Sequence, residues 1–101
     1  MYNEITLRKL LKDCIDDTLK SRKLGDWCYD AWFYYKEEEG KDQNPTKGFL
    51  DIIMQISSEW GLISLQYGFE GHFEKELLEH HLIKLEKLMN LEEEDLDKKD
   101  E

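Results

Sequence analysis

Apolar residues recur every three or four positions along four separate stretches of the chain, which is the spacing of one buried helix face. The first stretch covers residues 4–23 and ends on a basic run that suits the carboxyl end of a helix. Gly25 and Asp26 follow, and we expect the glycine to stop this helix and the aspartate to cap the next one. The apolar stripe of this first helix consists of Leu7, Leu10, Leu11, Cys14, Ile15, Thr18 and Leu19.

Three more helices are predicted further along the chain. The second covers residues 27–39, the third residues 49–60 and the fourth residues 71–90. Residues 40–48 contain the only proline and are predicted to form a loop. Within residues 61–68, Leu62, Ile63, Leu65 and Tyr67 could form a short strand, but no second strand is available to pair with it, so we expect a packed connector with room for one helical turn.

Four amphipathic helices joined by short connections are typical of a compact antiparallel bundle, so the predicted fold class is all-α. The bundle domain is expected to span residues 1–90. Residues 91–101 carry seven acidic and two basic side chains, and we predict that they form a disordered acidic tail. The alternative for this segment is an acidic arm that contacts a basic partner.

The charge of the chain excludes several classes of function. There are 24 acidic and 14 basic side chains, which give a formal net charge of −10, and half of this excess lies in residues 91–101. Because phosphate backbones attract Lys and Arg, we expect no direct binding to nucleic acid. No apolar run approaches the roughly 20 residues that cross a bilayer, so no membrane partner is expected.

The amino terminus and the cysteines bear on the compartment. The chain does not start with the basic and then apolar layout of a signal peptide. The two cysteines are Cys14 and Cys28, and both fall on apolar helix faces. We therefore expect a cytoplasmic protein in which both cysteines are buried free thiols.

Few side chains are spaced for catalysis or for metal binding. His72, Glu76 and His80 follow one another at intervals of four, but a single helix does not supply a closed metal site. Ser57 and Ser58 stand beside a carboxylate, yet the sequence places no histidine near them. Phosphate-binding loops and hydrolase motifs are absent from the sequence. We therefore predict no enzymatic activity, no metal and no cofactor.

The second predicted helix is the strongest candidate for a binding surface. It holds six aromatic residues among nine, followed by three consecutive glutamates. Tyr and Trp dominate interface hot spots, and clustered carboxylates speed the approach of a basic partner. The competing interpretation is that these aromatics form the core while the acids only solvate the surface. The predicted partner-binding residues are Tyr29, Asp30, Phe33, Tyr34, Glu37, Glu38 and Glu39.

A group of features surrounds the start of the second predicted helix. They are the run Lys20-Ser21-Arg22-Lys23, the helix start Gly25-Asp26-Trp27, and the later Asp30, Trp32 and Glu37-Glu38-Glu39. In this layout and in its composition the chain resembles the small, acidic, helical immunity proteins of bacterial toxin–immunity pairs, of the colicin and contact-dependent-inhibition types. The resemblance implies a cognate toxin, often a basic nuclease, whose active site or substrate surface the immunity protein blocks. It also implies contact with the toxin through Asp30, Tyr34 and residues 37–39.

Two other binding functions remain open from the sequence. One is a small regulatory or self-associating helical adaptor, and for this reason both a monomer and a homodimer are compatible with the sequence. The other is a nucleic-acid mimic of the anti-restriction or anti-CRISPR kind. A mimic spreads its charge along one continuous surface, whereas here six basic residues lie on the first predicted helix. This distribution disfavours the mimic.

Overall fold

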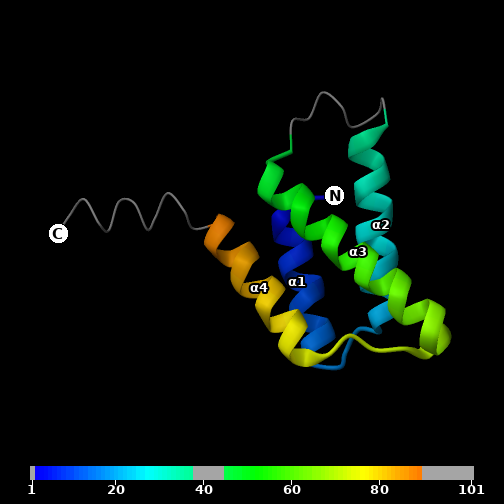
Figure 1. Ribbon diagram of the computed structural model, residues 1–101. Coiled ribbons are helices and arrows are strands. Elements are labelled where there is room, and N and C mark those ends of the chain that lie inside the picture. The colour runs from blue at the N-terminus through cyan, green and yellow to red at the C-terminus, as the bar shows by residue number, and fades with distance from the viewer. Residues whose placement is uncertain (1, 38–44, 90–101) are drawn as a thin grey trace.

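The computed structural model describes residues 2–37 and 45–89, and within these ranges it contains helices and no strands. The predicted acidic tail over 91–101, and the candidates Glu38 and Glu39, lie outside the described residues. The all-α prediction is confirmed (Figure 1). The elements are α1 (Glu4–Ile15), α2 (Ser21–Lys36), α3 (Lys47–Tyr67), the short 3₁₀ helix η2 (Gly68–Glu70) and α4 (Lys75–Met89).

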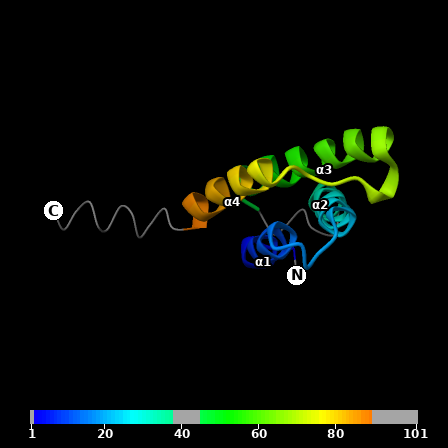
Figure 2. The same ribbon diagram turned by 90° about the horizontal axis from the view of Figure 1, so that it is seen from below.

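The four α-helices run alternately in opposite directions and form two layers (Figures 1 and 2). α3 and α4 make one layer, and α1 and α2 make the other. The strongest contacts join the layers, because α2 packs mainly on α3 and α1 packs mainly on α4. The core between the layers is built chiefly from Leu7, Leu11, Leu24, Cys28, Phe49, Ile53, Ile56, Leu78 and Leu85.

Side-chain caps fix the start of two helices. The Asn3 carboxamide oxygen accepts a hydrogen bond from the backbone N–H of Thr6 at 2.9 Å, at the start of α1. The Thr46 hydroxyl accepts from the backbone N–H of Phe49 at 3.2 Å, at the start of α3. Each cap satisfies a donor that the helix itself leaves without a partner.

The predicted end of the first helix was wrong, because α1 stops at Ile15 rather than near residue 23. Asp17 adopts a left-handed backbone conformation with φ of 63°, which a helix interior does not accommodate. The Thr18 hydroxyl and the backbone N–H of Thr18 both donate to the carbonyl of Asp13 and close this turn. The basic run at 20–23 consequently opens α2 instead of ending α1.

Gly25 does not end a helix either, and Asp26 does not cap one. Both residues lie inside α2, where Gly25 is buried against the indole of Trp60 on α3. A Cβ atom at position 25 would stand 2.2 Å from a ring carbon of Trp60. The glycine is therefore required by the close approach of two helices and not by a turn.

The connector predicted for residues 61–68 is helical. α3 continues through Gly61 as far as Tyr67, and Gly68 then ends it with φ of 76°. After η2 an extended segment, residues 71–74, leads to α4, which begins at Lys75 rather than at Gly71. The long α3 is the reason for several exposed apolar side chains, because its carboxyl half extends away from α4 (Figure 1).

α3 is the longest described helix, with 21 residues, but its sequence includes Lys47, Asp51 and Glu59. Over the residues that the structure describes, no helix combines the length and the apolar character needed to cross a bilayer.

We predict opposite effects for two glycine substitutions. Gly25→Ala forces its new methyl group into the Trp60 ring and should lower the free energy of unfolding by about 1–3 kcal/mol. Gly61→Ala places its methyl group in open space within a helix and should raise the free energy of unfolding by up to about 1 kcal/mol. Urea unfolding followed by circular dichroism compares both with wild type. A Gly25→Ala protein as stable as wild type would contradict the close helix contact.

Candidate partner-binding surface

Two aromatic side chains of α2 point away from the core. Tyr29 and Phe33 are 55% and 44% exposed, although both are large apolar groups on a helix that packs against α3. They are one turn apart, and their ring centroids are 4.7 Å from each other in a tilted arrangement. Each ring supports the other, so the pair presents a preformed apolar surface to solvent.

Exposed carboxylates lie on the same side of α2. At about 100° per residue, Asp26 and Asp30 fall in the same sector of α2, about 100° wide, as Tyr29 and Phe33, and Arg22 falls there too. Glu37, which is also exposed, directly follows the last residue of the helix. Asp26 forms an ion pair with Arg22 at 3.7 Å. The carboxylates of Asp30 and Glu37 form no hydrogen bond or ion pair with the residues that the structure describes. Both carboxylates are therefore available to an external cation.

Tyr34 was also predicted to face a partner, and its surroundings differ from those of Tyr29 and Phe33. It is half-buried, with ring centroids 5.2 Å from Tyr2 and 5.1 Å from Tyr35. The Tyr35 hydroxyl in turn donates a hydrogen bond to the backbone carbonyl of Tyr2. Tyr34 thus helps to pack the amino-terminal residues against α2.

A second group of exposed apolar residues was missed by the sequence analysis. Leu62, Leu65, Tyr67 and Phe69 are all more than 60% exposed on the end of α3 and on η2. The guanidinium of Arg22 stacks on the Phe69 ring at 4.3 Å and so connects the start of α2 with η2. The signal was present in the sequence, because no charged residue occurs between positions 60 and 69. The prediction of a connector for residues 61–68 did not place these side chains on a helix face.

A carboxylate–imidazole pair lies between α3 and α4. The buried His81 places its Nε2 2.9 Å and 3.2 Å from the two carboxylate oxygens of Glu59, so Nε2 carries the proton and donates. The Nδ1 of the same ring is buried and has no hydrogen-bond partner among the described residues. A catalytic base needs access to its substrate, and this nitrogen has none. The pair therefore serves to join α3 and α4.

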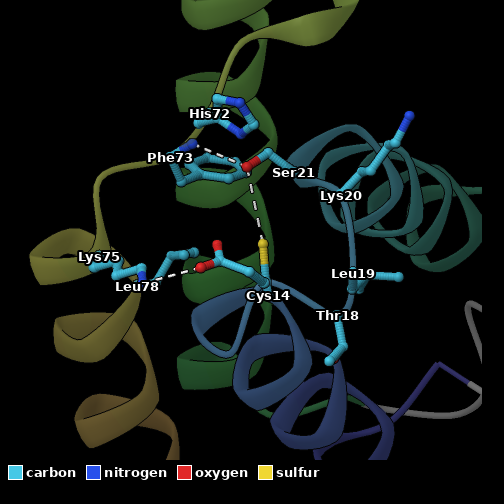
Figure 3. Close-up of a pocket in the computed structure, with 10 residues that line it drawn as sticks. Cys14, Thr18, Leu19, Lys20, Ser21, His72, Phe73, Lys75 and Leu78 are labelled. Atoms are coloured by element: carbon cyan, nitrogen blue, oxygen red, sulfur yellow. Dashed lines mark hydrogen bonds and ion pairs between the residues drawn. The ribbon is translucent and has the colours of Figure 1, made fainter.

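The cavity drawn in Figure 3 lies where α1, α2 and the start of α4 meet, and its volume is about 520 Å³. The Ser21 hydroxyl lines this cavity. This oxygen accepts a hydrogen bond from the backbone N–H of Phe73 at 2.9 Å and lies 3.8 Å from the Cys14 sulfur. At the rim, the Lys75 ammonium pairs with the Asp17 carboxylate at 3.1 Å.

The groups around this cavity are not arranged for nucleophilic catalysis. Burial raises the pKa of the Cys14 thiol, which lowers its thiolate fraction at neutral pH. The Ser21 hydroxyl is engaged by Phe73 and has no hydrogen bond to a histidine. The cavity is the place where Ser21 fastens the segment 71–74 to the start of α2.

The histidine and glutamate spacing considered for a metal does not persist in three dimensions. His72 precedes α4, so it does not continue the helical spacing of Glu76 and His80. All three side chains are exposed. Among residues 2–37 and 45–89, no group of three or more His, Cys, Asp or Glu side chains is close enough together to hold a metal ion.

Comparison with protein-family models, with curated proteins and with solved structures finds no match to this chain. The structural class of the protein is therefore described from the residues of the structure alone. They form an all-α helical bundle with an exposed aromatic pair in an acidic sector of α2.

We predict that both thiols are unreactive in the folded protein. Cys14 and Cys28 are buried, and burial raises the pKa of each, so little thiolate is present and reagents reach it poorly. Labelling with a maleimide at pH 7 should be at least about 100-fold slower than in guanidinium, because it requires opening of the fold. Fast labelling of either cysteine under native conditions would show that its burial is wrong.

The Ser21 hydrogen bonds give a second prediction. Ser21→Ala leaves the backbone N–H of Phe73 buried without its acceptor and should lower the free energy of unfolding by about 1–3 kcal/mol. Ser58→Ala, on the exposed face of α3, is the matched control and should change stability by less than about 0.5 kcal/mol. Equal stability of the two variants, measured by urea unfolding, would exclude a fastening role for Ser21.

Proposed function

We propose that this protein is an inhibitor that binds a basic partner protein through the outer sector of α2, in the manner of an immunity protein that neutralises its toxin. The observation that supports this proposal most directly is the stacked and exposed Tyr29–Phe33 pair in the sector that carries Asp30, with the exposed Glu37 just beyond the end of the helix. Aromatic anchors bordered by charge are the usual centre of a specific interface.

The aromatic pair supplies the apolar part of the proposed interface. Both rings are about half-exposed and already held against each other, so covering them removes apolar surface from water without ordering two free side chains. Aromatic anchors of this kind contribute about 2 kcal/mol or more each when they are fully desolvated at the centre of an interface.

The carboxylates supply the selectivity for a basic partner. Asp30 and Glu37 have no cationic partner among the described residues, so an incoming Lys or Arg forms an ion pair without breaking an internal one. The net charge of −10 adds a long-range attraction that salt weakens. A basic nuclease, which presents cations to bind its own phosphate substrate, is the kind of toxin that fits this surface.

Inhibition of this kind requires no chemistry from the inhibitor. A bound bundle occupies the cationic surface of the toxin and excludes its substrate by volume and by charge. This agrees with a cavity and a carboxylate–imidazole pair that offer no activated nucleophile or accessible base.

We predict that the partner is captured from native cell lysate as a single stoichiometric basic protein by the tagged full-length chain, and that less is retained at high salt. With that protein purified, Tyr29→Ala and Phe33→Ala should each weaken binding at least about tenfold. Asp30→Lys should chiefly slow association, because it reverses the local charge. Surface plasmon resonance at two salt concentrations measures both quantities.

Ile83→Ala is the control, because Ile83 is 53% exposed on α4 and lies outside this sector. It should bind like wild type. Circular dichroism establishes that each variant stays folded. Wild-type affinity in all three α2 variants would mean that the partner binds another surface, and capture of no basic protein would reject the proposed function.

A further inference from the structure

From Met54 to Leu65, one exposed face of α3 carries no charge, whereas Lys47 and Asp51 occupy the same face nearer the start of the helix. Met54, Ser58, Gly61 and Leu65 follow one another at spacings of four, three and four residues. At about 100° per residue they lie within about 60° of one another around the helix. All four are exposed, and Leu62 (70% exposed) borders them. We refer to these five residues as the α3 seam.

The neighbours of α3 within the protein cover its other sides. Trp60, roughly opposite the seam, packs against Gly25 of α2, and Glu59 binds His81 of α4. The middle of the seam therefore faces away from both packing partners, while Met54 and Ser58 at one edge line a pocket together with His80 and Lys84 of α4. We infer that it is the interface with a second copy of this chain, formed by two α3 helices that cross in antiparallel orientation.

Gly61 is the first reason to place another helix on this face. A glycine in a helix interior is unfavourable by about 1 kcal/mol relative to alanine. At Gly25 and Gly71 the close approach of other groups within the chain requires glycine, but a Cβ atom at Gly61 would meet nothing within 4 Å. A small residue at the centre of an exposed apolar face allows a second helix backbone to approach closely, as Gly25 allows α2 to approach Trp60.

The second reason is charge, which also indicates that the molecule bound to the α3 seam is a second copy of the chain. A basic protein is attracted to carboxylates, and the seam has none. A second copy carries the same net charge of −10 and is repelled from most of the surface. From Trp60 to Phe69 the sequence WGLISLQYGF has no charged residue, although 38% of the whole chain is charged. The seam residues of this stretch, Gly61, Leu62 and Leu65, form an exposed surface on which two acidic copies can meet without opposing carboxylates.

The spacing of the seam is self-complementary. In an antiparallel pair related by a two-fold axis near position 59 or 60, Met54 faces Leu65 of the second copy, and Ser58 faces Gly61 of the second copy. Each long apolar side chain thus meets another long apolar side chain at the two ends of the crossing. Each small residue meets a small residue at the centre, where the helices are closest.

The exposed area agrees with a weak dimer. Met54 is 40% exposed and Leu65 is 86% exposed. With roughly 200 Å² of surface for each large side chain, Met54, Leu62 and Leu65 leave about 400 Å² exposed on each copy, or about 800 Å² for the pair. Ser58, Gly61 and flanking atoms bring the total toward the ~1,000 Å² at the lower end of specific interfaces. We therefore expect dissociation in the micromolar range.

The inference does not depend on the proposed function, because the α3 seam and the acidic sector of α2 are on different helices in different layers (Figure 2). The two contacts also respond oppositely to salt. Binding of a basic partner weakens as salt is added, whereas the dimer is maintained or strengthened, because salt screens the repulsion between two acidic copies.

Analytical ultracentrifugation of the full chain, from about 1 µM to about 300 µM, tests the inference. The 12.2 kDa chain should approach twice that mass at the upper concentrations, at both low and high salt. Leu65→Glu places one carboxylate in the seam of each copy, facing Met54 of the other copy. It should raise the dissociation constant of the dimer at least about tenfold. Ile83→Glu, at an equally apolar exposed site on α4, should dimerise like wild type.

Cross-linking provides a second measurement that does not depend on a destabilising change. Ser58→Cys places an exposed thiol near the two-fold axis, while Cys14 and Cys28 stay buried. A short bismaleimide should join two Ser58→Cys chains efficiently and should not join two Glu79→Cys chains, whose thiol is exposed on α4. A wild-type monomer at every concentration overturns the inference. So does a dimer that Leu65→Glu leaves unchanged, or equal cross-linking of the two cysteine variants.

Discussion

The contact between Gly25 and Trp60 determines how the rest of the bundle is arranged. Because Gly25 has no side chain, α2 lies against the Trp60 indole, and this closeness brings Leu24, Cys28 and Ala31 into the core. The same indole lies 5.9 Å from the Phe73 ring, whose backbone N–H is held by Ser21 at the start of α2. One tryptophan therefore joins α2, α3 and the segment 71–74. A single close contact in this position orients α2 about its own axis, and that rotation decides which side chains of α2 face solvent.

The exposed surfaces follow from this rotation. Of the six aromatic residues between positions 27 and 35, Trp27, Trp32 and Tyr35 are half-buried and pack against the core, and the half-buried Tyr34 packs against Tyr2. Tyr29 and Phe33 remain exposed to solvent, although their aromatic rings are apolar. On α3 the buried side is occupied by Trp60 and Ile56, and the opposite side presents Gly61 and Leu65. The two candidate interfaces are thus the outer faces of the two helices that Gly25 and Trp60 hold together.

Helical periodicity in the sequence predicts the fold class and the core, because the stripes through Leu7, Leu11, Ile53 and Leu85 follow a 3.6-residue repeat that folding does not alter. It does not predict the role of a glycine. The sequence alone does not distinguish a glycine required by a helix–helix contact, such as Gly25, from a glycine that ends a helix. Gly61, which lies within α3, likewise resembles the start of a loop in the sequence. The early end of α1 depends on the left-handed Asp17, whose conformation is set by local hydrogen bonds to Asp13. For the candidate site, spacing along the helix places Tyr29, Asp30 and Phe33 on related faces. Only the packing of Tyr2 reveals that Tyr34 is partly covered.

The distribution of charge separates the two proposed contacts and permits them to coexist. Under the two proposals, the acidic sector of α2 would attract a basic partner and repel a second copy, whereas the uncharged α3 seam would attract no basic partner and tolerate a second copy. Because the two helices belong to different layers, an α3–α3 crossing leaves both acidic sectors accessible. A dimer formed in this way would carry two partner-binding faces, and a weak self-association would then increase the apparent affinity for any partner that is itself dimeric or clustered. The proposed dimer would also give a role to the exposed, uncharged residues Gly61, Leu62 and Leu65, at positions where solubility alone favours charge.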